Sequence, residues 1–346
     1  MEAMEQQTFF IGGNTADGFV PYVDGVFSGL RRLFVLKGGP GTGKSTFMKR
    51  VAAYAEVHGA AVERYLCSSD STSLDGVVVR EAGIGILDGT KPHAYEARYP
   101  GAFETLIDPG LYWDRGILAS RFDLIRGLSD KKSELYQTVY KHLGVCRALR
   151  AERKTLLASV FDEEKAERAV TRMMRRIGEG KGFLLLPRQV YAFGMQGEVT
   201  LSTYRKMSEH TVCITDKRGL GVFLLEKMLK HAARMGLVTY VSRDTTSAPT
   251  ALYFPEKRLT VTSTPAEEKD TILNTERFVK KERLSEVRLQ LRFLKRLEEE
   301  MFGHAEALFA DIAACHFELE KVYAEAMNYR AMEEMSAAFI ERELAL

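Results

Sequence analysis

Residues 38–46 carry the strongest chemical signal in the sequence. They read Gly-Gly-Pro-Gly-Thr-Gly-Lys-Ser-Thr, which fits the phosphate-binding pattern G-x-x-x-x-G-K-[ST]. Glycines let main-chain N–H groups approach a phosphate chain, Lys44 supplies a positive charge, and the Ser45 hydroxyl is a ligand for Mg²⁺. The residues expected to hold the nucleotide are Gly38, Gly39, Gly41, Thr42, Gly43, Lys44, Ser45 and Thr46.

Asp88 is the candidate carboxylate for the metal. It directly follows the apolar run 84–87, and a carboxylate after such a strand reaches Mg²⁺, usually through water, in this class of nucleotide site. Since Gly89 comes next, an Asp-Gly turn is the alternative role. We assign Ser45 and Asp88 to the metal. The residue directly after Asp88 is not acidic, so the acidic pair that many ATPases use is absent and fast hydrolysis by the chain alone is not expected. His93 is a candidate γ-phosphate sensor, although a lone histidine in a polar loop is more often structural.

Two further aspartates follow the strand predicted at 61–67. Asp70 and Asp75 stand where open α/β sheets place ligand-contacting residues, past the end of a strand. They are expected either to hold a second substrate or the attacking water, or to cap and turn the chain. The residues assigned to catalysis are Lys44, Asp70, Asp75 and Asp88.

The residues around the phosphate-binding stretch predict a strand before it and a helix after it. Residues 33–37 form a short apolar run typical of a buried strand. Residues 47–55 have apolar side chains at helical spacing, and Gly59 stands where a glycine commonly ends a helix. A helix beginning here directs the positive end of its dipole at the bound anion.

The composition is that of an ordinary globular protein. The 346 residues include 49 basic and 47 acidic side chains, for a formal net charge of +2, so no overall field favours nucleic acid or an anionic membrane. The acidic N-terminus and the absence of a long apolar run predict a cytoplasmic protein without a membrane span. The four cysteines are far apart and indicate small core residues, not disulfides or a zinc site.

The order of features returns in the second half of the chain at an offset of about 175 to 180 residues. Gly219 and Gly221 fall at the positions of the last two glycines of the phosphate-binding stretch. However, Val222 and Phe223 replace its lysine and serine, and Ser263 stands near the position of the metal-binding aspartate. The second half is therefore predicted to keep the strand and helix pattern and to have lost the ligand.

Each half is followed by a predicted helical arm with charged outer faces. Apolar residues recur at spacings of three and four from about residue 113 to 176, and again toward the C-terminus. Gly303 is expected to mark a hairpin turn between a helix over 267–300 and the last helix. Such seams pack on another helix, so the arms are expected to pair within the chain or across a dimer.

Several stretches of the first half resemble a family of bacterial tandem P-loop ATP-binding proteins, mostly of Gram-positive lineages. The shared stretches are Gly13-Asn14-Thr15 with Gly18-Phe19, Leu36 to Thr46, Cys67-Ser68-Ser69-Asp70 with Ser73-Leu74-Asp75-Gly76, and Asp88-Gly89-Thr90-Lys91-Pro92-His93. They cover most of residues 9–115. The resemblance implies ATP binding, ATPase activity and two tandem P-loop halves, each with a helical insertion. Both halves can carry an intact loop in this family, and the chain departs from that pattern at Val222 and Phe223.

The sequence thus predicts an internally duplicated α/β protein of the three-layer α/β/α P-loop class, with α-helical hairpin insertions. The expected units are a nucleotide-binding domain (1–112), a helical arm (113–182), a degenerate P-loop-like domain (183–265) and a C-terminal arm (266–346).

The expected function is that of an ATP-binding, Mg²⁺-dependent NTPase with slow hydrolysis, which is regulatory or coupled to a protein partner. GTP is the alternative nucleotide. The first alternative function is a small-molecule or nucleotide kinase, in which Asp70, Asp75 or Arg80 holds the phosphate acceptor. The second is a nucleotide-gated binding module without turnover.

Overall fold

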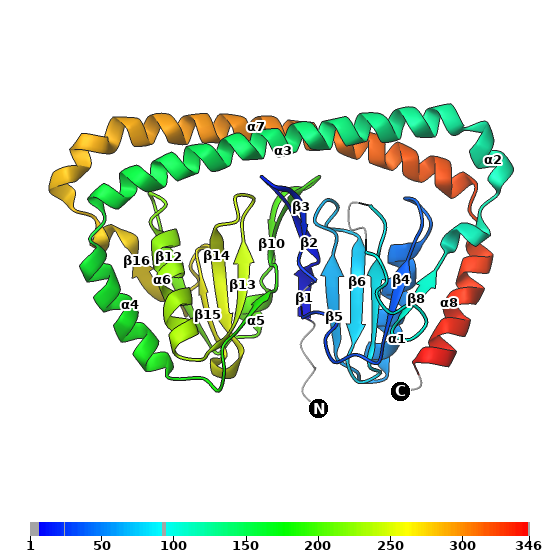
Figure 1. Cartoon of the computed structure of the whole chain (residues 1–346), viewed down its shortest axis with the longest axis horizontal. Coiled ribbons are helices and arrows are strands. Elements are labelled where there is room, and N and C mark those ends of the chain that lie inside the picture. Colours follow the sequence, from blue (N-terminus) through cyan, green and yellow to red (C-terminus); the bar gives the residue numbers. More distant parts are fainter. Residues whose placement is uncertain (1–6, 24, 92–94, 345–346) are drawn as a thin grey trace.

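Two α/β halves stand side by side beneath a pair of long antiparallel helices (Figure 1). The computed structural model describes residues 7–23, 25–91 and 95–344. The fold is mixed α/β, with parallel-rich sheets and helices. In the described part of the chain, no helix is both long and apolar enough to cross a membrane.

The first half is built on a six-stranded sheet in the order β1-β5-β6-β7-β4-β8. Its strands are β1 (Gln7–Phe10), β4 (Arg32–Leu36), β5 (Val62–Leu66), β6 (Leu74–Val79), β7 (Ile84–Asp88) and β8 (Glu104–Ile107). Strand β6 is antiparallel to both neighbours, and the other adjacent pairs are parallel. Helix α1 (Lys44–Val57) follows β4, and its buried Phe47, Val51 and Ala55 pack toward the sheet.

The second half repeats this strand order and these directions. Its sheet runs β9-β13-β14-β15-β12-β16, and β14 is the strand antiparallel to both neighbours. The strands are β9 (Leu184–Pro187), β12 (His210–Thr215), β13 (Val238–Arg243), β14 (Pro249–Phe254), β15 (Leu259–Thr262) and β16 (Thr271–Asn274). Helix α6 (Gly221–Arg234) follows β12. Because β16 is the edge strand, this sheet extends beyond the boundary expected at residue 265.

Each half sends a β-hairpin across to the other. The hairpins are β2 (Gly12–Thr15) with β3 (Gly18–Pro21), and β10 (Tyr191–Gly194) with β11 (Gly197–Thr200). At one tip the Ala16 N–H donates to the Thr245 carbonyl, and at the other the Met195 N–H donates to the Ser69 carbonyl, both at 2.8 Å. These reciprocal bonds fix the two halves against each other.

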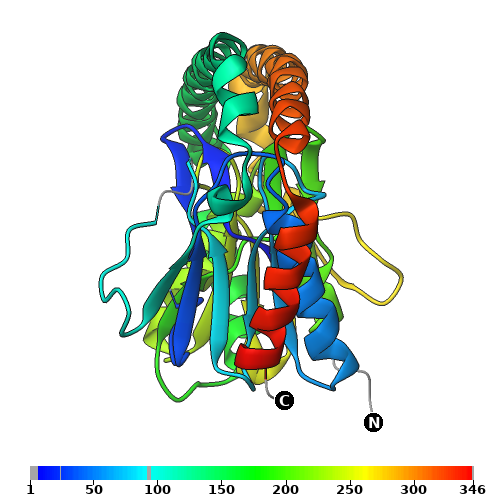
Figure 2. The same cartoon turned by 90° about the vertical axis from the view of Figure 1, so that its right-hand side faces the viewer.

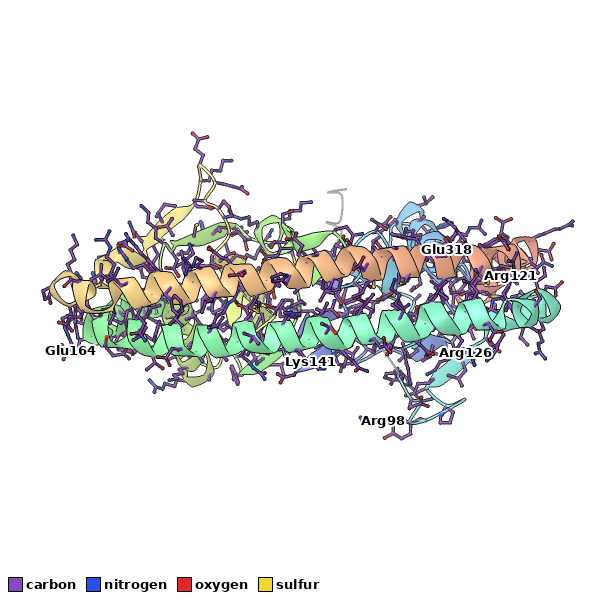
Figure 3. All side chains as sticks on the ribbon, turned by 90° about the horizontal axis from the view of Figure 1, so that it is seen from above. Arg98, Arg121, Arg126, Lys141, Glu164 and Glu318 are labelled. Carbon is purple, nitrogen blue, oxygen red and sulfur yellow. The ribbon has the colours of Figure 1, made fainter. Side chains whose placement is uncertain are left out.

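Two long helices form the roof of the molecule. Helix α3 (Phe122–Val160) has 39 residues and α7 (Lys281–Glu325) has 45. The two lie side by side along the long axis (Figure 3), and Val139 and Leu143 of α3 share one buried cluster with Ala305 and Phe309 of α7. The arms therefore pair within the chain.

The predicted hairpin turn at Gly303 is wrong, because α7 passes through this residue without a break. A glycine inside a helix costs only about 1 kcal/mol. Burial of the neighbouring Ala305 and Phe309 against α3 offsets that cost.

The last helix of each arm returns to a sheet, but not in the expected way. Helix α4 (Glu163–Ile177) packs on α6, and α8 (Tyr329–Glu343) packs on α1, as Figure 2 shows for the second pair. The Phe339 ring meets Phe34 and Phe47 edge-on at 4.7 and 5.0 Å. The expected helical hairpin in each half is replaced by the α3–α7 pair, and the C-terminal helix completes the first half.

Candidate nucleotide-binding site

The glycine-rich loop predicted to bind phosphate, residues 38–46, is called the phosphate loop below and joins the end of β4 to the start of α1. The last residue of β4, Leu36, lies beside Asp88 in the parallel β4–β7 pair, so Asp88 stands at the edge of the sheet where the loop begins. Gly41 and Gly43 have φ angles of +69° and +80°, a region that favours glycine. The expected strand, loop and helix are all present, and Gly59 follows the helix with φ +81°.

Lys44 is buried inside the loop. Its ammonium donates to the carbonyls of Gly38 and Gly39 at 2.8 and 2.6 Å, and it lies 3.6 Å from the Asp88 Oδ2. The other carboxylate oxygen of Asp88 accepts from the Thr90 N–H at 2.9 Å. One oxygen of Asp88 therefore forms the turn, and the other faces the phosphate loop and its cation.

The loop has the donors and the hydroxyl that a phosphate with Mg²⁺ requires. Among the described residues, no side chain caps α1, so its first N–H groups are free of side-chain acceptors at the loop. The Ser45 hydroxyl accepts from the Leu74 N–H at 2.9 Å and retains a second lone pair for a metal. Thr42 closes the loop by donating to the Gly39 carbonyl at 2.9 Å, and Thr46 is exposed.

The described residues contain no group of three or more acidic, histidine or cysteine side chains arranged as a metal cage. Proteins often hold Mg²⁺ by one or two side chains together with the phosphates. Ser45 and Asp88 are the residues that would hold it, and the ion would neutralise charge on the phosphates.

Asp70 is committed to its own loop and to the other half. Its Oδ1 accepts from the Thr72 N–H at 3.1 Å, from the Thr72 hydroxyl at 2.8 Å and from the Gln196 amide at 3.0 Å. Gln196 belongs to the turn between β10 and β11 and also accepts from the Ser71 N–H at 3.0 Å. These bonds favour the structural role of Asp70 over a role in chemistry.

Asp75 lies in β6 and Arg80 directly follows that strand, which the sequence analysis missed. Asp75 is a buried strand residue near the loop edge of the sheet. The pKa of the nearby Cys67 thiol is raised, mainly by burial of the thiol and next by the negative charge of Asp75. Arg80 follows the other end of β6, where it contacts Glu63 and the Val26 carbonyl. Because β6 runs antiparallel to its neighbours, Arg80 lies at the edge opposite the phosphate loop, and its expected place beside an acceptor is wrong.

The junction of α7 and α8 covers the outer side of the loop. The Tyr329 hydroxyl donates to the Gly41 carbonyl at 2.8 Å. A Cβ on Gly41 would lie 2.5 Å from the Glu320 carbonyl oxygen, and one on Gly39 would lie 3.0 Å from the Tyr323 ring. The glycines therefore also allow the roof to pack on the loop. Nothing local in the sequence connects residues so far apart.

Helix α3 brings a second cation near the loop. Burial lowers the pKa of the Lys132 ammonium, Cys315, Cys67 and Glu320 oppose that shift, and the Lys44 ammonium adds to it. Tyr136 lies one turn further along α3, and burial raises its pKa while a hydrogen bond with Ser69 lowers it. The sequence analysis placed both residues in the helical arm, Lys132 on its charged outer face and Tyr136 among the apolar residues at helical spacing.

The second loop, residues 216–221, is occupied by its own carboxylate. Asp216 accepts from the N–H groups of Arg218 at 3.1 Å, Gly219 at 3.0 Å and Gly221 at 2.5 Å, and from the Thr275 hydroxyl at 3.1 Å. A resident anion thus satisfies the main-chain donors of this loop. The sequence analysis noted the lost lysine and serine, but not this substitution.

The residues that replace the serine and the aspartate in the second half have structural partners. The Phe223 ring stacks on Phe161 at 4.9 Å. Ser263 is exposed and donates to the Thr250 carbonyl at 3.1 Å. Neither offers a charge to a metal. His93 lies outside the described residues.

Comparison of the chain with protein-family models, with curated proteins and with solved structures finds no match.

Proposed function

We propose that the protein binds ATP with Mg²⁺ at the phosphate loop of the first half and hydrolyses it slowly. In this proposal the loop N–H groups and Lys44 hold the phosphates, and Ser45 and Asp88 hold the metal. The 3.6 Å approach of the Lys44 ammonium to the Asp88 carboxylate supports it. These two charges neutralise each other before ligand binds, and each has an opposite charge to bind afterwards.

The observation that carries the proposal is the contrast between the two loops. The N–H groups of the second loop converge on the Asp216 carboxylate. In the described structure of the first loop, Gly38 stands at the position of Asp216, and the donors receive no such carboxylate. A loop of the same connectivity that lacks its own anion is suited to an external one.

We also propose that both halves are P-loop domains derived by internal duplication. Their sheets share strand order and direction. In each half the loop joins the second sheet strand in chain order, β4 or β12, to a helix of 14 residues. Under this proposal the second half is a scaffold in which the Asp216 carboxylate occupies the position of a nucleotide phosphate.

Slow turnover and coupling to the roof follow from what surrounds the loop. Asp88 is followed by a glycine, which carries no base, and the Asp70 carboxylate is engaged by Thr72 and Gln196. Neither the following glycine nor Asp70 therefore supplies a free base beside the Asp88 carboxylate. Glu320 and Tyr329 touch the loop from the roof side, where they would sense its conformation. The same contacts favour the nucleotide-gated module as the second candidate. The kinase alternative is weakened by the position of Arg80.

The test is ATP consumption by the full chain with Mg²⁺, with and without a panel of phosphate acceptors. Acceptor-independent turnover that disappears in Lys44→Ala supports the ATPase. Acceptor-dependent turnover would replace it with a kinase. Tight binding without turnover would leave the gated module, and no binding by calorimetry would overturn the nucleotide site.

A further inference from the structure

A basic cavity of about 440 Å³ lies between α7 and the second loop. Six of its lining side chains are cations that come from three separate elements: Arg153 from α3, Lys217 and Arg218 from the loop, and Arg288, Arg292 and Lys295 from α7. No acidic side chain is among the described residues that line it. Cations that converge from three elements on one cavity differ from the spread charge of a solvated helix face.

The cations are only partly neutralised. Arg153 bonds to Glu298, Arg218 to Glu276 and Lys295 to Glu299. In the described part of the chain, Lys217, Arg288 and Arg292 have no carboxylate within ion-pair distance. In addition, the Nε–H of Arg153 is buried without a hydrogen-bond partner. The cavity therefore offers unused positive charge and an unused donor.

The α7 cations that line the cavity are exposed, and they stand on a helix face that also packs on the second half. Arg288, Arg292 and Lys295 are spaced four and three apart, so they share one face of α7, where like charges repel. Leu284 and Leu291 lie on the same face and pack against the core of the second half. Packing of the leucines thus holds the cations over the cavity despite their repulsion.

We propose that this cavity binds a small, metal-free polyphosphate, at a site separate from the phosphate loop. Its volume falls in the range of small-molecule pockets, roughly 300 to 1,000 Å³. An arginine guanidinium can bind two phosphate oxygens at once. Because the Asp216 carboxylate already accepts from the loop N–H groups, the phosphate would be bound by the side chains. A bound polyphosphate would link α3, α7 and the second loop.

The test measures inorganic tripolyphosphate binding by calorimetry, with EDTA present and ionic strength fixed. The protein is the full chain carrying Lys44→Ala, which removes the cation of the first loop. One binding site is expected. Adding Arg288→Ala and Arg292→Ala should weaken it roughly tenfold or more, as expected when charge-assisted hydrogen bonds are lost. The matched control pair is Arg283→Ala with Arg296→Ala, which removes two α7 cations that do not line the cavity.

Three outcomes would overturn the proposal. These are no tripolyphosphate binding to the Lys44→Ala chain, an equal loss in the control pair, or tighter arginine-dependent binding of a single-stranded oligonucleotide. Thermal melts of each variant verify folding. The proposal is independent of the nucleotide site: binding that requires Lys44 and not Arg288 or Arg292 would refute the cavity and leave that site standing.

Discussion

The Tyr329 hydroxyl donates to the Gly41 carbonyl at 2.8 Å, so the C-terminal helix touches the phosphate loop across 288 positions of the chain. Glu320 approaches the same glycine through its main chain. The loop is therefore bounded by its own sheet on one side and by the roof on the other. A change in the conformation of Gly41 would therefore act directly on the α7–α8 junction.

Hydrogen exchange should report this contact. Because the loop touches Glu320 and Tyr329, Mg²⁺-ATP is expected to slow amide exchange in residues 320–335. The internal control is α4, which packs on α6 in the other half as α8 packs on α1. Mass spectrometry that finds equal protection in both helices would contradict coupling through the junction.

Lys44→Ala should weaken ATP binding roughly tenfold or more. The lost interaction is a charge-assisted hydrogen bond worth about 1.5 to 3 kcal/mol. The matched control is Lys49→Ala on the same helix, since the Lys49 ammonium donates to the Thr72 carbonyl and not to the loop. Calorimetry on folded variants measures the affinity for ATP. An unchanged affinity in Lys44→Ala would refute the assignment of the nucleotide site.

Asp88→Asn should keep metal-free nucleotide binding and lose most of the gain in affinity that Mg²⁺ provides. The carboxylate oxygen that faces the loop is the charged ligand available to the metal, while the amide retains the turn with Thr90. Asp70→Asn is the control, because its carboxylate serves Thr72 and Gln196. Titrations of both variants with nucleotide, with and without Mg²⁺, measure this gain. A wild-type gain in Asp88→Asn would show that Asp88 acts only in the turn.

The pH dependence of binding should identify Lys132 as part of the site. Burial lowers the pKa of its ammonium, so its charge is lost at a lower pH than that of an exposed lysine. The charged form attracts phosphate, and affinity for ATP should therefore fall as pH rises through this lowered pKa. Lys132→Gln should flatten the decline and Lys132→Arg should abolish it while retaining affinity. Identical profiles in all three proteins would exclude Lys132.

Sequence reasoning could predict what neighbouring residues determine. The strand before Gly38, the helix after Ser45 and the place of Asp88 at a strand end are local consequences of apolar runs and glycines. It missed β6 because Leu74–Val79 follows a polar loop and contains the turn-like pair Asp75-Gly76. The roof contacts on Gly39 and Gly41 come from residues nearly 280 positions away. No periodicity reports such packing.

For the second half, the sequence prediction was incomplete for a different reason. Loss of the lysine at Val222 was visible in the sequence, but an aspartate at the start of a glycine-containing loop is also a common turn former. Only the geometry places the Asp216 carboxylate against three loop N–H groups.

One Mg²⁺-nucleotide should bind per chain, in the first half. Val222 offers no cation to the phosphates, Phe223 no ligand to Mg²⁺, and the Asp216 carboxylate occupies and repels the position of a phosphate. Calorimetry under saturating Mg²⁺ should give a stoichiometry of one for the wild type and no tight site for Lys44→Ala. Asp216→Asn removes the resident charge and keeps an oxygen that accepts from the loop, so it should bind no additional Mg²⁺-nucleotide. Two sites in the wild type, or one tight site that survives in Lys44→Ala, would refute the assignment of the second half as a scaffold.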